Sequence, residues 1–136
     1  MRALLDPSVL ISALLAGGSP AKVLRSWPDG AYELVVSPLL LEELERALTY
    51  RKVCEHVRTH EWLALLNLLR RQAQLMDDPT EPPPLRSPDP GDDYLIVLAS
   101  AAGASLISGA NHLLCLGRQF PMYSPAAFLA RLESAL

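Results

Sequence analysis

Short apolar runs alternate along this chain with longer segments in which apolar residues recur every three or four positions. The short runs are typical of buried strands, and the longer segments are typical of helices that pack on them. Strands are predicted at 2–5, 33–36, 104–108 and 120–123. Helices are predicted at 20–27, 38–49, 52–58, 60–76, 93–102, 111–116 and from 125, with a short helix or turn at 8–15. This alternation predicts parallel strands with helices on both faces of the sheet.

Ser-Pro dipeptides mark several of the predicted helix starts. Serine is favoured at the N-cap of a helix, and proline is favoured at the first helical position. Three of these dipeptides precede helix-like sequence, so helices are expected to begin near Pro20, Pro38 and Pro125.

Composition predicts a single folded domain over residues 1–136. Hydrophobic residues make up 50% of the chain, which is enough for a substantial core. The formal net charge is −3, so the chain does not hold nucleic acid by bulk charge. A nucleic-acid enzyme remains possible, because bound cations offset the charge of an acidic metal site.

The chain carries no pattern of a secreted or membrane protein. Asp6 interrupts the first apolar stretch, and no signal-peptide core with a cleavage site follows. The apolar runs are shorter than the roughly 18 residues that span a bilayer. Cys54 and Cys115 are isolated, with no C-x-x-C pair. We therefore expect a cytoplasmic protein without a membrane partner, in which both cysteines are buried free thiols.

Asp6 is the most unusual acidic residue in the sequence. It ends the apolar run Ala3-Leu4-Leu5 and therefore lies at the carboxyl end of the first predicted strand. In α/β proteins this edge of the sheet holds the functional sites. The alternative is that Asp6 only caps the turn at Pro7-Ser8.

Glu43 differs from the other acids of its predicted helix. Its neighbours at i−4, i−3, i+4 and i+7 are Leu39, Leu40, Ala47 and Tyr50, so it projects from a largely apolar stripe. A carboxylate there needs a cation or hydrogen bonds. The alternative is a boundary glutamate that reaches solvent.

Asp92 and Asp93 form the third acidic position. They follow a proline-rich stretch at 77–91, predicted to be a surface loop, and they precede a nearly all-apolar helix. Aspartates at a helix start usually serve as caps, which is the alternative here. If the three acidic positions meet, they form an oxygen-ligand site for a divalent metal.

Four blocks in order resemble the PIN domain family of small metal-dependent nucleases, many of which are toxins of toxin–antitoxin pairs. The family patterns LDTNVLVSALL and LSPELLEELRRVL are similar to LDPSVLISALL at 5–15 and VSPLLLEELERAL at 36–48. DPDDDxxLALAxAAGA is similar to residues 89–104, and LVTGDxDLL is similar to LISGANHLL at 106–114. The tail at 123–129 is also similar to that of the family.

The resemblance implies an α/β/α sandwich with three layers and a central, mainly parallel sheet of about four to five strands. It assigns the family acids to Asp6, Glu43 and Asp93, with Asp92 as the close alternative, and implies that these residues bind Mg²⁺ or Mn²⁺. Ser8, Ser108 and Asn111 are the expected supporting residues. The implied partners are an RNA substrate, a small antitoxin protein and a second copy of the chain in a homodimer.

Two family acids are missing. Ala110 and His112 stand at their positions, and Ser8 replaces a family asparagine. The sequence therefore leaves two functions open. The chain is either a metal-dependent endoribonuclease of the toxin type, or a PIN-like fold whose degraded site serves as a non-catalytic binding or interaction module. A third alternative is an unrelated α/β domain whose acids are only helix caps.

Overall fold

A five-stranded sheet forms the centre of the computed structural model, which describes residues 1–135 apart from the side chain of His112. The strands are β1 (Arg2–Leu5), β2 (Glu33–Val36), β3 (Gln74–Leu75), β4 (Ser105–Ile107) and β5 (Met122–Tyr123). They lie in the order β3-β2-β1-β4-β5, and all four pairings are parallel. The predicted α/β class and the parallel sheet are confirmed.

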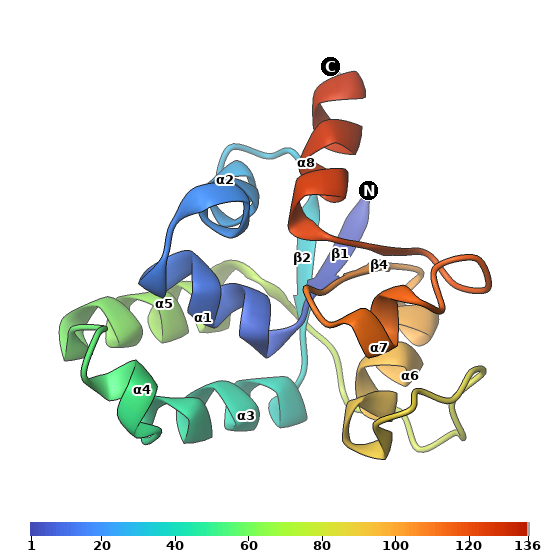
Figure 1. Cartoon of the computed structure of the whole chain (residues 1–136), viewed down its shortest axis with the longest axis horizontal. Helices are drawn as coiled ribbons and strands as arrows, with labels where there is room; N and C mark the ends of the chain where they lie inside the picture. Colours follow the sequence, from blue (N-terminus) through green and yellow to red (C-terminus); the bar gives the residue numbers. More distant parts are fainter. Residues whose placement is uncertain (136) are drawn as a thin grey trace.

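Helices cover both faces of the sheet. They are α1 (Pro7–Leu15), α2 (Gly18–Ser26), α3 (Pro38–Leu48), α4 (Arg51–Cys54), α5 (Thr59–Gln72), a 3₁₀ turn η1 (Pro90–Asp92), α6 (Asp93–Ala102), α7 (Asn111–Leu114) and α8 (Pro125–Ser134). Helices α1 to α5 lie on one side, and α6 and α7 on the other (Figure 1). Right-handed crossovers explain this division, because the chain moves outward from β1 to β3 and then returns past β1 to β4.

Strand β3 was not predicted. The sequence indicated a helix through residue 76, whereas α5 ends at Gln72 and Ala73 is extended. Residues 74 and 75 pair with the last two residues of β2, and the Met76 amide donates to the carbonyl of Val36 at 2.9 Å. This short edge strand depends on a neighbour that is distant in sequence, so local periodicity does not reveal it.

The Ser-Pro rule holds at two of its three predicted sites. Ser37 and Ser124 cap α3 and α8 by accepting from backbone amides. Helix α2 instead begins at Gly18, after Gly17 with a φ of 71°, and it has no side-chain cap. The left-handed conformation at Gly17 turns the chain early, so Ser19 and Pro20 already lie inside the helix.

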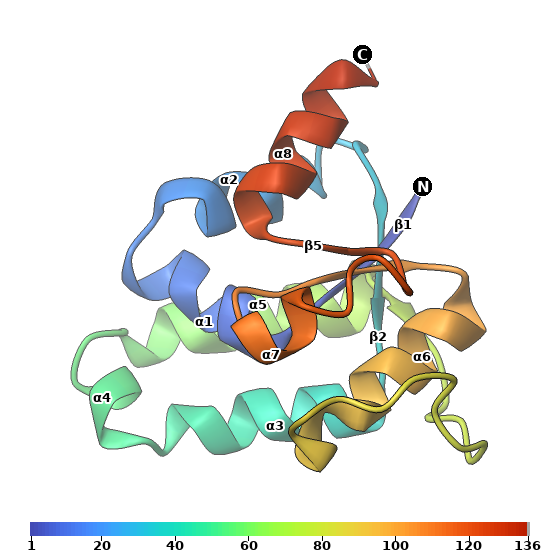
Figure 2. The same cartoon turned by 45° about the vertical axis from the view of Figure 1, so that its right-hand side comes forward.

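Helix α6 is buried along most of its length. Its apolar residues Leu95, Ile96, Leu98 and Ala99 are fully shielded from solvent and pack in the core with the strands. Gly103 closes the helix with a φ of 62°, as its sequence position predicted. The helix begins at the carboxyl edge of the sheet, where α3 also begins (Figures 1 and 2). This brings the third acidic position to the rim of the sheet.

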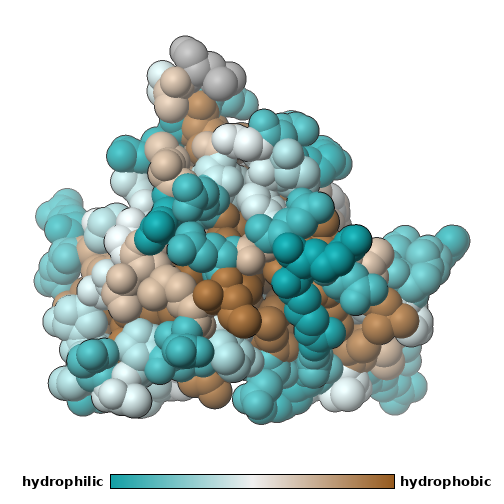
Figure 3. All heavy atoms as spheres, turned by 180° about the vertical axis from the view of Figure 1, so that it is seen from behind, coloured by the Kyte–Doolittle hydropathy of each residue, from teal (hydrophilic) through white to brown (hydrophobic). Residues whose placement is uncertain are grey.

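The surface corrects the prediction for the cysteines. Cys54 and Cys115 are both exposed, not buried, and they form no disulfide. Cys54 ends α4 and Cys115 follows α7, and both of these four-residue helices have too few turns to bury a complete face. Seen from behind, the apolar surface forms separate areas with hydrophilic side chains between them (Figure 3).

No single helix among the described residues is long and apolar enough to cross a bilayer. Helices α1 and α2 reach that length and composition only together, and the chain bends by 109° between them.

The cap of α3 tests how this helix is positioned. The buried Ser37 hydroxyl accepts from the Leu40 amide at 3.3 Å. Ser37→Ala removes that acceptor and should lower the free energy of unfolding by about 1 kcal/mol in urea denaturation. Ser26→Ala is the control, because its hydroxyl only donates to the Lys22 carbonyl within α2, and a change below about 0.5 kcal/mol is expected. Equal stability of Ser37→Ala and the wild type would contradict the role of the cap.

Candidate functional site

The carboxyl ends of β1 and β4 bring Asp6 and Ser108 together. Asp6 follows β1 directly and is 7% exposed, and Ser108 follows β4 and is fully buried. The Ser108 hydroxyl donates to Asp6 Oδ2 at 2.8 Å, and it accepts from the Ala110 amide at 3.0 Å. The backbone amide of Asp6 also donates to the Ile107 carbonyl at 2.9 Å. The Asp6 carboxylate is therefore held from two neighbouring strands.

Asp6 also caps helix α1. Its Oδ1 accepts from the Ser8 amide at 3.0 Å, while the Ser8 side chain is exposed. The start of a helix favours a negative charge, because its backbone amides point outward. The sequence offered two roles for Asp6, a residue at the rim of the sheet and a cap of the turn at Pro7-Ser8. In the structure Asp6 has both positions. The two roles use different oxygens of one carboxylate.

Glu43 faces the same edge of the sheet from α3. It is half-buried, and its Oε2 accepts from the Tyr94 hydroxyl at 2.8 Å. Burial raises the pKa of Glu43, and the negative charges of Asp6 and Asp92 raise it further. The Tyr94 hydrogen bond and the Arg46 charge oppose that shift in pKa. A raised pKa is expected for a carboxyl group that shares a site with other acids and no cation to offset them.

Asp92 and Asp93 have different surroundings although they are adjacent in sequence. Asp93 is 8% exposed, its Oδ1 accepts from the Ser87 amide at 2.7 Å, and its Oδ2 lies 3.5 Å from Arg86 Nη1. Asp93 therefore fastens the proline-rich loop to the start of α6. The charge of Asp92, in contrast, raises the pKa of both Glu43 and Tyr94.

The effect of its charge on the pKa of Glu43 favours Asp92 as the acid that accompanies Asp6 and Glu43. Counting along the sequence pointed to Asp93 with Asp92 as the close alternative, and the choice between them stays a prediction. Successive residues at a helix start project about 100° apart, so only one of two adjacent aspartates can face the sheet edge while the other faces the loop. The register of α6 in the folded chain decides between them.

A pocket of about 240 Å³ lies between α1 and α3 at this edge. It is lined by Asp6, Pro7, Ser8, Ile11, Glu43, Arg46, Ala47 and Tyr50. Two of the three acids thus share one pocket with a cation and an aromatic ring. Such an arrangement of polar groups in a concavity is typical of a binding or catalytic site.

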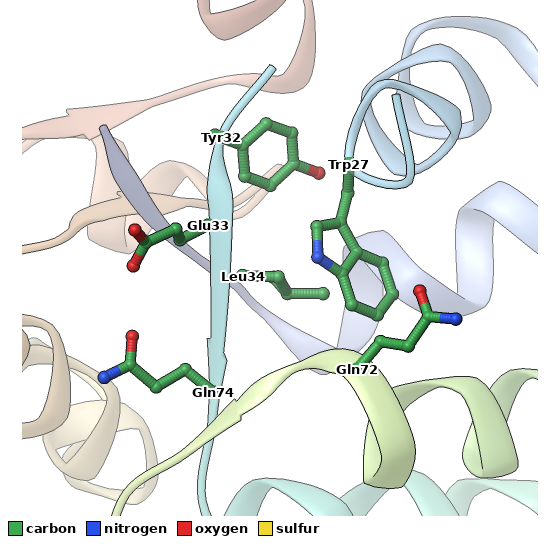
Figure 4. Close-up of a pocket in the computed structure, with 6 residues that line it drawn as sticks. All are labelled: Trp27, Tyr32, Glu33, Leu34, Gln72 and Gln74. Carbon is green, nitrogen blue, oxygen red and sulfur yellow. The ribbon is translucent and has the colours of Figure 1, made fainter. Parts of the chain in front are cut away.

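A second pocket, of about 260 Å³, lies at the opposite end of β2 (Figure 4). Figure 4 shows Tyr32 and Leu34 on one side of the strand with Trp27, and Glu33 on the other. Gln72 and Gln74 complete the lining. Strand β3 pairs only with Val35 and Val36, so the pocket borders the part of β2 that β3 leaves uncovered. Glu33 is its one acidic lining residue, so this pocket does not combine carboxylates.

A sequence model of the PIN domain matches residues 2–112. The chain belongs to the PIN domain family. None of the curated proteins matches its sequence at a significant level. Membership of the PIN family excludes the third alternative from the sequence, an unrelated α/β domain whose acids are only helix caps.

Two solved structures share the fold of this PIN domain. VapBC2 from Rickettsia felis, bound to a DNA fragment from its promoter, aligns with a TM-score of 0.59 and 13% identity over 91% of this chain and 98% of that chain. PAE2754 from Pyrobaculum aerophilum aligns with a TM-score of 0.59 and 21% identity over 98% of this chain and 96% of that chain. These likenesses confirm the predicted three-layer arrangement.

The acids of the PIN domain have the right chemistry for a hard cation. Mg²⁺ and Mn²⁺ prefer oxygen ligands, and the pocket supplies carboxylates. Within the described part of the chain, however, no three His, Cys, Asp or Glu side chains gather closely enough to hold one ion. Mg²⁺ often binds through only one or two carboxylates and keeps several waters. The residues therefore fit a partly hydrated ion better than one enclosed by three acids.

The far side of the site differs from the rest. Ala110 offers no side-chain cap to α7, and Asn111 is exposed at the first position of that helix. Asn111 does not line the pocket, and its supporting role stays a prediction. His112, which stands at the position of a family acid, lies outside the described side chains.

Sequence reasoning missed two residues of the site. Tyr94 lies beside the predicted acids and is the only hydroxyl-bearing residue in the first half of the apolar α6. Arg46 follows Glu43 by three positions and therefore shares its side of α3. The argument about Glu43 considered its neighbours at i−4, i−3, i+4 and i+7, which include Tyr50. Its i+3 neighbour is Arg46, which the same argument would have found.

Ser108 provides a direct test of the Asp6 arrangement. Ser108→Ala leaves both Asp6 Oδ2 and the Ala110 amide without this partner, and we expect a loss of about 1–3 kcal/mol in the free energy of unfolding. Ser134→Ala removes only an exposed bond to the Ala130 carbonyl and should change stability by less than about 0.5 kcal/mol. Chemical denaturation measures both variants, and a neutral Ser108→Ala would refute the buried contact.

The raised pKa of Glu43 predicts a pH-dependent gain in stability on substitution. Ionised Glu43 destabilises the metal-free fold above its raised pKa, and this effect vanishes below the pKa of an ordinary glutamate, where both states are protonated. Glu43→Gln keeps an acceptor for Tyr94 and should melt at a higher temperature than the wild type at neutral pH. The difference should disappear by about pH 4.

Thermal melts in a chelator across this pH range measure the effect. Glu42→Gln is the matched control, because Glu42 is exposed on the same helix. A Glu43→Gln protein that is less stable than the wild type at neutral pH would contradict the electrostatic account.

Proposed function

We propose that this PIN domain is a metal-dependent ribonuclease that hydrolyses RNA phosphodiester bonds with Mg²⁺ or Mn²⁺. The observation that carries the proposal is the pairing of Asp6 and Glu43 in one pocket, with Asp92 near enough to raise the pKa of Glu43. PIN domains are generally nucleases, and in this chain the acids lie at the edge of the sheet where α/β enzymes hold their substrates.

Phosphodiester hydrolysis requires a nucleophilic water and neutralisation of the charge that develops at phosphorus. A divalent ion supplies both when bound. Asp6 would be the principal ligand, because Ser108 and the start of α1 hold its carboxylate in one orientation. Asp92 would bind through water, and Asp93 stabilises the loop beside it.

Glu43 has the properties of a proton acceptor. Its raised pKa brings it closer to neutral pH, where a general base works best. Among the described contacts, Tyr94 occupies Oε2, which leaves Oε1 to accept a proton from the attacking water. Tyr94 thus orients the carboxyl group and keeps part of its charge stabilised.

We also propose that the chain is the toxin of a toxin–antitoxin pair, with a small antitoxin protein as partner and a homodimer as its working form. The support is the family, many of whose members are such toxins, and the shared fold with VapBC2 from Rickettsia felis. Fold likeness at this identity is an analogy. The same analogy favours a cytoplasmic location.

A non-catalytic binding module is the second candidate function. Ala110 stands where the family has an acid, and no three-ligand group is present among the described side chains. A module of this kind would retain the fold and the pocket without hydrolysing RNA.

An RNA cleavage assay separates the two candidates. We expect the wild type to degrade single-stranded RNA with Mn²⁺ and to stop when a chelator is added. Asp6→Asn and Glu43→Gln should each lower the rate at least about 100-fold, because each removes a ligand or the proton acceptor. Glu42→Gln, an exposed neighbour on α3, should keep the wild-type rate.

Calorimetric titration with Mn²⁺ completes the test. Asp92→Asn should weaken Mn²⁺ binding more than Asp93→Asn does, provided that both variants fold. If wild type, Asp6→Asn and Glu43→Gln are equally inert and none of them binds Mn²⁺, the module is correct and the ribonuclease proposal is refuted.

A further inference from the structure

The pocket extends beyond the acids along one side of α3. Glu43, Arg46 and Ala47 share one side of α3, Tyr50 lies after the end of that helix, and all four line the pocket. Tyr50 is seven residues beyond Glu43 in the sequence. The half of the pocket near Arg46 and Tyr50 has no role in the metal chemistry described above.

Tyr50 is an aromatic side chain held out into solvent on a fixed backbone. It is 56% exposed, although it lines a pocket. Its amide donates to the Ala47 carbonyl at 3.0 Å, and its carbonyl accepts from the amides of Val53 and Cys54, each at 2.9 Å. Ring contacts between aromatic side chains occur elsewhere in the described chain, but none involves Tyr50. The ring is therefore positioned without being packed.

Arg46 is the cation of this pocket. Its positive charge lowers the pKa of Glu43, which places it close to the acids. The arginines nearby are engaged, since Arg51 pairs with Glu55 and Arg70 pairs with Glu45. Arg46 has no such salt bridge within the described residues. Its guanidinium is thus available to an anion that enters the pocket.

We propose that Arg46 and Tyr50 form a nucleotide subsite for single-stranded RNA, in which Tyr50 stacks on a base and Arg46 binds the adjoining phosphate. This inference rests on the proposed ribonuclease function and specifies its substrate. An aromatic ring stacks on any unpaired base, and a guanidinium binds phosphate oxygens through two parallel hydrogen bonds.

The aromatic ring of Tyr50 and the net charge of the chain both favour single-stranded RNA as the ligand. A base inside a duplex is already stacked on its neighbours, so Tyr50 selects for single-stranded RNA. A chain with a net charge of −3 cannot attract RNA by its overall field, so contacts at the pocket must provide the binding. The subsite holds one nucleotide while its neighbouring phosphate lies at Asp6 and Glu43.

Fluorescence anisotropy with a labelled single-stranded RNA, in a chelator so that no cleavage occurs, tests the subsite. Tyr50→Ala should weaken binding about 10-fold, and Tyr50→Phe, which keeps the ring, should stay within about twofold of the wild type. Arg46→Gln should weaken binding and lower the slope of log affinity against log salt by about 0.7. Arg71→Gln, an exposed position of α5 that does not line the pocket, is the control for general charge and should bind like the wild type.

Two further measurements separate the subsite from the acids. Mn²⁺ affinity should be unchanged in Tyr50→Ala, and with Mn²⁺ present this variant should show a raised KM and a nearly normal kcat. Binding of a perfect RNA duplex should not respond to Tyr50→Ala. If Tyr50→Ala binds single-stranded RNA like the wild type, if it loses single strand and duplex equally, or if the wild type binds neither, the subsite is refuted. Binding that depends on Tyr50 without any cleavage would instead refute only the catalytic proposal.

Discussion

The hydrogen bond between Ser108 and Asp6 is the contact on which the site depends. A carboxylate that is nearly buried at the end of a strand is unfavourable unless its oxygens are satisfied. Ser108 satisfies one oxygen and the first turn of α1 satisfies the other. The same two bonds join the ends of β1 and β4 to the start of α1. The orientation of Asp6 and the shape of the sheet edge therefore have one cause.

The negative charges at this edge oppose one another, and the surrounding residues moderate the repulsion without removing it. Tyr94 donates to Glu43, and Arg46 adds a positive charge at the rim of the pocket. Glu43 nevertheless keeps a raised pKa, so part of the electrostatic strain remains in the metal-free protein. Natural proteins accept such local destabilisation where a function requires it. Asp93, in contrast, is satisfied by Ser87 and Arg86.

The pocket divides its tasks along α3. Glu43, at one end, faces Asp6 and carries the proposed chemistry, while Tyr50, at the other, is exposed and suited to hold a base. Arg46 lies between them and can act on both, because it moderates the charge of Glu43 and offers a ligand to phosphate. Helix α3 and the turn that follows it thereby connect the proposed reaction and recognition sites.

The sequence by itself determined the α/β class and most of the helices and strands, and it singled out Asp6 and Glu43 as acids in apolar surroundings. Those features follow from local periodicity and from the placement of a charge in an apolar segment, both of which are visible within a few residues. Tertiary structure decided the rest. Strand β3 exists because β2 offers it a pairing edge, and Tyr94 meets Glu43 because the fold brings the start of α6 to α3. Contacts between distant segments set both outcomes, and no local pattern encodes the direction in which a folded helix is turned.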